Sequence, residues 1–141
     1  MPSFTATTTI AAPAERVWQT LLRTDAWPIW DTSLDRVEGT LVDGGRITIH
    51  VTGSSRPFKL QVATWEPHRR IVLRGGMPLG LFTGTRTYAL DETAGSTTMT
   101  MSEIYTGPLA GLVGRSIPDL QPAFDSFVAG LRDAVESPQN A

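Results

Sequence analysis

Two segments in the second half of the chain carry acid–base side chains at intervals of two residues. LFTGTRTYAL (residues 81–90) contains Arg86 and Tyr88, and TTMTMSEIY (residues 97–105) contains Glu103 and Tyr105. Side chains two residues apart on a β-strand point to the same face of a sheet. Threonines occupy much of the alternate face in both segments, so we expect the threonine faces to be solvated and these four groups to point inward.

A guanidinium, a carboxylate and two phenols on one inner surface could act in two ways. They could hold a carbonyl or carboxylate oxygen of a ligand, or supply the base, acid and oxyanion partner that remove a proton next to a carbonyl. A turn at DETAGS (91–96) would place Arg86 directly or diagonally opposite Glu103. We expect an inward ion pair in which Glu103 orients Arg86; the alternative is a structural pair closed off from any ligand.

Apolar side chains are expected to line the same surface. In DAWPIWDTSL (25–34), Trp27 and Trp30 flank Pro28. Large rings beside a stiff bend are typical of core anchors, and one ring face could also border a cavity. Methionine suits such a wall because its flexible side chain adapts to varied ligands. The predicted ligand-binding residues are Trp30, Phe82, Arg86, Tyr88, Met99, Met101, Glu103, Tyr105, Phe124 and Phe127.

No residue pattern indicates a nucleophile, a metal site or a cofactor site. The chain contains no cysteine, and its two histidines, His50 and His68, are distant in sequence. The glycines of GGRI and RGGMPLGLFTG do not fit a phosphate-binding motif with its lysine and helix. We therefore expect no cofactor and no metal, and the candidates for metal-free acid–base catalysis are Arg86, Glu103, Tyr88 and Tyr105.

The elements that would position these groups follow from hydrophobic periodicity. FTATTTI (4–10) is predicted as a strand, APAERVWQTLLR (12–23) as a helix, and residues 25–33 as a second short helical or bent piece. From Leu34 the period changes to two, which predicts six consecutive strands. LQPAFDSFVAGLRDAVE (120–136) has one apolar face. Its regular part should begin near Pro118, with residues 108–117 as a separate short helix or loop.

The whole chain resembles the SRPBCC superfamily of START, Bet v 1-like and polyketide cyclase-like domains. The resemblance rests on IAAPAERVWQTLLRTDAWPIWDTSLDRVEG (10–39), WEPHRRIVLRGG (65–76) and YTGPLAGLVG before the last helix. It implies an α+β helix-grip fold, in which a curved seven-stranded antiparallel sheet wraps around a long C-terminal helix and two short helices follow the first strand. It also implies an apolar cavity between sheet and helix.

Length, charge and hydropathy narrow the possible partners. A chain of 141 residues suits one domain over residues 1–141. A formal net charge of -2 with scattered basic residues argues against nucleic acid, and no apolar run is long enough to span a membrane. The first residues, MPSFTATTTIAAP, lack the charged and apolar regions of a secretory signal. We therefore expect a cytoplasmic protein that is a monomer or a weak homodimer.

One predicted loop is unusually apolar. GGMPLGL (75–81) carries Met77, Leu79 and Leu81 between two predicted strands. Apolar side chains in a loop could form a lid, a membrane-touching tip or a dimer contact, or they could be buried under the last helix.

Three functions are compatible with these observations. We favour binding of a small hydrophobic or aromatic molecule in the cavity, as a carrier or sensor. The resemblance implies two alternatives, a polyketide cyclase/aromatase-like enzyme acting on a hydrophobic carbonyl compound and a co-chaperone-like protein-interaction domain. An inward acid and base open to a ligand would favour the enzyme. A collapsed cavity with an exposed apolar surface would favour the interaction domain, because one fold can host many functions.

Overall fold

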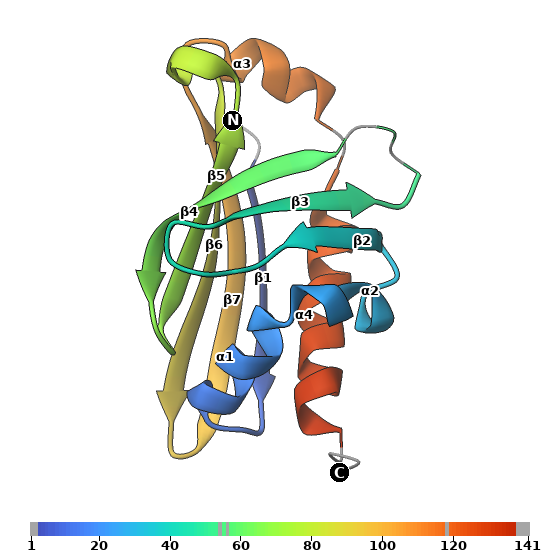
Figure 1. Cartoon of the computed structure of the whole chain (residues 1–141), viewed down its shortest axis with the longest axis vertical. Coiled ribbons are helices and arrows are strands. Elements are labelled where there is room, and N and C mark those ends of the chain that lie inside the picture. Colours follow the sequence, from blue (N-terminus) through green and yellow to red (C-terminus); the bar gives the residue numbers. More distant parts are fainter. Residues whose placement is uncertain (1–2, 54, 56, 118, 138–141) are drawn as a thin grey trace.

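An antiparallel sheet of seven strands curls around one long helix in the computed structural model, which describes residues 3–53, 55, 57–117 and 119–137 (Figure 1). The strand order β1-β7-β6-β5-β4-β3-β2 is that of a meander whose last strand returns beside the first. This is the expected helix-grip fold of class α+β. The strands are β1 (Ser3–Ile10), β2 (Leu34–Gly39), β3 (Arg46–Val51), β4 (Phe58–Glu66), β5 (Arg70–Gly76), β6 (Thr83–Thr93) and β7 (Ser96–Thr106).

The period of two in the sequence corresponds to the two faces of the sheet. Along β7 the bulky face is buried, while Thr98 and Ile104 on the other face are exposed. The sheet therefore turns the predicted face toward α4, and the side chains that are buried on β7 are Thr97, Met99, Met101, Glu103 and Tyr105.

Two helices follow β1, as expected. α1 (Ala14–Leu22) buries Val17, Trp18 and Leu21 on one stripe, and the Glu92 carboxylate of β6 accepts a hydrogen bond from the Ala14 N–H at 2.6 Å. A carboxylate at this position also suits the positive end of the helix dipole. A 3-10 turn, η1 (Thr24–Ala26), leads into α2 (Trp27–Trp30), where Pro28 occupies the first turn. Proline is tolerated there because no intrahelical N–H bond is required.

The last helix, α4 (Gln121–Glu136), begins later than the sequence suggested. Pro118 lies outside the described residues. The Gln121 N–H donates to the Asp119 carboxylate at 3.0 Å, and Pro122 falls in the first turn. The preceding segment forms separate short turns, α3 (Ala110–Val113) and η3 (Gly114–Ser116). The prediction of a separate segment before the helix is confirmed, and the regular helix begins at Gln121, whose N–H has Asp119 as its acceptor.

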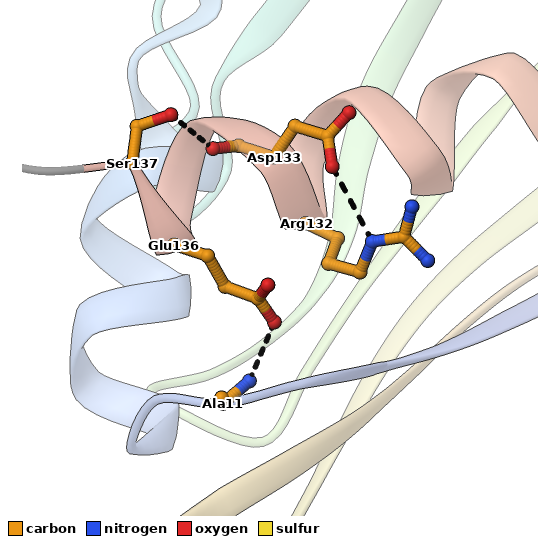
Figure 2. A network of polar contacts seen from close by, with 5 residues as sticks. All are labelled: Ala11, Arg132, Asp133, Glu136 and Ser137. Atoms are coloured by element: carbon orange, nitrogen blue, oxygen red, sulfur yellow. Dashed lines mark hydrogen bonds and ion pairs between the residues drawn. The ribbon is translucent and has the colours of Figure 1, made fainter.

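Both ends of α4 are tied to the β1 region. At the start, the Gln121 amide donates to the Thr5 carbonyl of β1 at 2.7 Å. At the end, the Glu136 carboxylate accepts a hydrogen bond from the Ala11 N–H at 2.8 Å, as Figure 2 shows. Arg132 and Ser137 bond only to Asp133 within the network drawn there. The helix is thereby fixed along the edge strand at two separated points.

Gly130 lets α2 approach α4 closely. A Cβ atom at this position would lie 2.1 Å from the Trp30 carbonyl oxygen and 2.8 Å from its ring. Real side-chain carbons do not approach a backbone oxygen so closely, so the contact requires glycine even though glycine disfavours helices by about 1 kcal/mol relative to alanine.

We expect Gly130→Ala to destabilise the protein by about 1–3 kcal/mol in urea unfolding, because overpacking outweighs the gain in helix propensity. Gly111→Ala in α3 is the matched control, since a Cβ there meets nothing within 4 Å. It should be neutral or slightly stabilising. Equal stabilisation by both changes would show that the approach of α2 to α4 is not tight.

Candidate functional site

A cavity of about 760 Å³ lies between the inner face of the sheet, α4 and the α3–η3 segment. Most of its wall is apolar, and residues from six strands, β2 to β7, contribute to it. Its polar wall residues include Arg86, Glu103 and Tyr105 from β6 and β7. The principal apolar wall residues are Ile49, Leu60, Met101, Leu120, Phe124 and Phe127, with Phe58, Met77, Phe82, Val113 and Ile117 among those closer to solvent.

An aromatic cluster closes one side of this space. The fully buried Trp27 ring lies 4.9 Å from the Phe127 ring of α4 and 6.0 Å from the Tyr88 ring of β6, between centroids. Its indole N–H donates to the Leu21 carbonyl at 2.9 Å. Trp27 is thus a core anchor that also borders the cavity. Edge-to-face contacts of this kind add stability beyond the burial of the rings.

Arg86 and Glu103 face each other across the β6–β7 hairpin, in direct register. An Nη atom of Arg86 lies 3.4 Å from Glu103 Oε2. The same oxygen accepts a hydrogen bond from the Tyr105 hydroxyl at 2.7 Å. The Arg86 guanidinium carbon lies 5.0 Å from the centroid of the Phe124 ring. The predicted inward pair is confirmed, and it forms part of the cavity wall together with Tyr105.

Burial and mutual contact set the charges in this cluster. Burial is the largest single effect and opposes the charge on Arg86, but the Glu103 carboxylate and Tyr88 together outweigh it, so the pKa of the guanidinium is raised. Burial, reinforced by Glu103, raises the pKa of Tyr105 above its ordinary value. Burial also raises the pKa of Tyr88, although Arg86 acts in the opposite direction. At neutral pH the wall therefore presents a cation and a protonated phenol that donates to Glu103.

Arg86 retains hydrogen-bonding capacity. Within the part of the chain that the structure describes, its buried Nε atom has no hydrogen-bond partner, and the contact to Glu103 is long for a charge-assisted bond. The Tyr88 hydroxyl interacts electrostatically with the guanidinium. It likewise has no hydrogen-bond partner among the described residues. A loosely held guanidinium in an apolar wall is suited to binding an oxygen acceptor.

Three of the predicted residues do not reach the cavity wall. Tyr88 and Met99 are fully buried, and Trp30 is half-buried with its ring 5.1 Å from that of Phe127. The prediction that they line the cavity is wrong in this structure. Tyr88 also packs against Trp27 and Phe127, in the part of the core that the aromatic cluster fills. Strand periodicity gives the face of a side chain but not how far along the strand the cavity extends.

Asp31 and Ser33, which were not predicted from the sequence, also belong to the cavity wall. Asp31 is buried, and its Oδ1 atom accepts hydrogen bonds from the Ser33 N–H at 3.0 Å, the Ser33 hydroxyl at 2.7 Å and the Ser126 hydroxyl of α4 at 2.8 Å. This carboxylate joins the end of α2 to α4. The available signal was the Asp-Thr-Ser sequence after the helix, because aspartate typically bonds to the backbone two residues on.

Within the described ranges no histidine belongs to a metal-binding group, and the loop at 75–81 is exposed. No three potential metal ligands come together anywhere in the described ranges, and His50 is bonded to Glu38 of β2. Leu79 is almost fully exposed, and Met77 and Leu81 are also exposed. The alternative that this loop is buried under the last helix is therefore wrong. No helix in the described ranges is both long and apolar enough to cross a membrane.

Comparisons with known proteins agree with this architecture. A family model described as polyketide cyclase / dehydrase and lipid transport matches residues 1–136. No curated protein sequence matches the chain. Hypothetical protein jhp0584 from Helicobacter pylori superposes with a TM-score of 0.77 at 14% identity, over 96% of this chain and 88% of that chain.

Two solved structures with named functions have the same fold. Truncated norcoclaurine synthase from Thalictrum flavum has a TM-score of 0.69 at 14% identity, over 98% of this chain and 95% of that chain. The di-domain ARO/CYC protein StfQ from the steffimycin biosynthetic pathway has a TM-score of 0.70 at 14% identity, over 95% of this chain and 50% of that chain. At such identities the similarity is one of fold.

The two tyrosines of the chain allow a direct test of the cluster's electrostatics. Because the pKa values of both are raised, no tyrosinate absorbance should appear near pH 10, where an exposed tyrosine titrates, while the protein stays folded. Their contribution to stability is present below pH 10 and is lost as the pH rises through the folded-state values, because the unfolded chain ionises first. An ultraviolet titration measures tyrosine ionisation, and circular dichroism over the same pH range measures the loss of folded protein. In Tyr105→Phe only Tyr88 remains, so this variant assigns each absorbance change to one tyrosine. Tyrosinate near pH 10 in the folded protein would contradict the buried phenols.

Proposed function

The chain belongs to the polyketide cyclase / dehydrase and lipid transport family, and on that premise we propose that it binds a small, mostly apolar molecule in the cavity, as a carrier or sensor. The ligand carries a carbonyl or acidic oxygen that binds to Arg86. The proposed ligand-contacting residues are those of the predicted set that reach the wall: Phe82, Arg86, Met101, Glu103, Tyr105, Phe124 and Phe127.

The placement of Arg86 is the observation that carries this proposal. The Arg86 side chain is only 17% exposed in a mostly apolar wall, and its carboxylate partner lies 3.4 Å away and is shared with Tyr105. A buried ion pair is weak evidence for stability, because desolvation of both ions offsets most of their attraction. Arg86 nevertheless retains donors that this pair does not use. A ligand oxygen would give these donors a partner.

The dimensions and chemistry of the cavity support the same function. Its volume of about 760 Å³ falls within the range of small-molecule sites. Apolar walls supply affinity through burial, and a small number of polar groups fix orientation. Tyr88 and Trp30 would act indirectly, through their ring contacts with Trp27 and Phe127. An open cavity of this size is also the opposite of the collapsed one expected for a protein-interaction domain.

A polyketide cyclase/aromatase-like activity is the second candidate. Glu103, Tyr105 and Arg86 meet at one place on the wall, and StfQ, from a biosynthetic pathway, shares the fold. In such a reaction Glu103 would take a proton from the carbon next to a ligand carbonyl, and Arg86 would stabilise the enolate oxygen. Glu103 Oε2 already accepts a hydrogen bond from the Tyr105 hydroxyl. Ligand binding therefore requires less rearrangement of these groups than proton abstraction by Glu103 would.

A double-mutant series tests the role of Arg86. Arg86→Met should lower the free energy of unfolding by on the order of 2–3 kcal/mol, because it leaves Glu103 buried without its cation. Arg86→Met combined with Glu103→Leu should restore most of this loss. Two fluorescent probes, anilinonaphthalene sulfonate and uncharged phenylnaphthylamine, separate affinity for an anionic oxygen from apolar burial. The double variant should bind the sulfonate at least about tenfold more weakly and the uncharged probe unchanged.

The matched control is Arg70→Met, which removes an exposed arginine paired with Glu66 on the surface. It should change the free energy of unfolding by no more than about 1 kcal/mol. It should leave the affinity for both probes unchanged. If the double variant is as stable as the parent and binds the sulfonate with unchanged affinity, the pair is structural and the ligand role is wrong. Loss of turnover on a carbonyl substrate would favour the enzyme over the carrier.

A further inference from the structure

Exposed apolar side chains from two segments gather at one end of the molecule. The β5–β6 loop carries Met77, Leu79 and Leu81, and α3 carries Leu112. Leu79 is 97% exposed, Leu112 68% and Met77 42%. The loop and α3 lie together at the upper end of the long axis in Figure 1. We call these four residues the apolar tip. Ordinary surfaces scatter such residues singly, so a gathered set indicates an interaction site.

The apolar tip is a built structure. The Leu109 N–H donates to the Leu81 carbonyl at 2.9 Å, which joins the two segments, and the Met77 N–H donates to the Phe82 carbonyl at 2.8 Å. Leu79 adopts a left-handed backbone conformation, with φ of 61°. This conformation is unfavourable for leucine and common for glycine or asparagine. The loop thus holds an apolar side chain in solvent at a position where a smaller polar residue would fit better.

The two sequence segments that carry the apolar tip contain no acidic residue. Residues 67–90 and 104–118, which include both segments, contain no aspartate or glutamate, although the chain has 14 acidic residues and a net charge of -2. Arg74 on β5 and Arg115 on η3 are exposed in these ranges, and the exposed Lys59 of β4 lies at the cavity wall. This end of an acidic protein is therefore apolar and cationic, which favours an anionic partner.

The apolar tip is continuous with the cavity. Met77 belongs to both, and Phe82, which follows the loop, and Val113 of α3 also line the cavity. Apolar side chains would therefore connect a surface that contacts the tip with the interior of the cavity.

We propose that the apolar tip inserts into the headgroup region of an anionic lipid bilayer, with Arg74, Arg115 and Lys59 against the lipid phosphates. Protruding leucines beside cations are the combination that binds such interfaces. A second copy of this chain fits less well, because a two-fold contact through the tip would bring the arginines of both copies together. This inference goes beyond the proposed function and does not require a bound ligand.

Vesicle cosedimentation of the whole chain tests the proposal. The parent protein should bind vesicles that contain phosphatidylglycerol, bind phosphatidylcholine vesicles weakly, and lose binding as salt is added. Leu79→Asp with Leu112→Asp should reduce the partition coefficient at least about tenfold, and Arg74→Glu with Arg115→Glu should remove the preference for the anionic vesicles. All four side chains are exposed, so melting temperatures should stay close to the parent value.

The matched control is Ile29→Asp, which changes an isoleucine that is 82% exposed on α2. It should bind anionic vesicles as the parent does. The proposal is overturned if the parent binds no vesicle, or if Ile29→Asp loses as much binding as the tip variant. It is also overturned if Leu79→Asp dissociates a dimer in analytical ultracentrifugation while vesicle binding is absent. Probe affinity in solution should be the same in parent and tip variants, so this test and that of ligand binding fail separately.

Discussion

The separation between the sheet and α4 depends on Trp27. Its ring is fully enclosed between Tyr88 of β6 and Phe127 of α4, and its indole N–H is fixed by the Leu21 carbonyl. The helix cannot close onto the sheet where these rings lie, because interiors pack densely and three aromatic side chains occupy the space. Hydrogen bonds at both ends hold α4 along β1. Beyond the aromatic cluster the gap is not filled, and the cavity occupies it.

This arrangement gives the two sides of the cavity different chemistry. One side is a group of packed aromatic rings, and the hydrogen bond from Ser126 to Asp31 connects α4 to the end of α2 beside it. The other side consists of short turns, a loop and the start of β4, with exposed leucines and cations. Arg86 lies between them on the sheet, paired with Glu103 and over the Phe124 ring. A ligand with an apolar body and one acidic or carbonyl oxygen complements this distribution of groups.

Much of the fold and part of the site could be predicted from the sequence, for identifiable reasons. The period of two placed Arg86 and Glu103 on the inner face, and the short turn between the strands placed them in register. The depth of the cavity could not be predicted, because it depends on how Trp27 and Phe127 meet across elements distant in sequence. Tyr88 and Met99 share the predicted face but lie in the filled part. Asp31 was missed because its acceptor role depends on Ser126, far along the chain.

The central claim is that ligands occupy the open part of the cavity and not the aromatic core. Nuclear magnetic resonance of the methionine methyl groups tests it most directly, because Met101 and Met77 line the cavity while the fully buried Met99 does not. On titration with anilinonaphthalene sulfonate, the account predicts large ring-current shifts at Met101, smaller shifts at Met77 near the opening, and little change at Met99. A saturable shift at Met99 with Met101 unperturbed would contradict it.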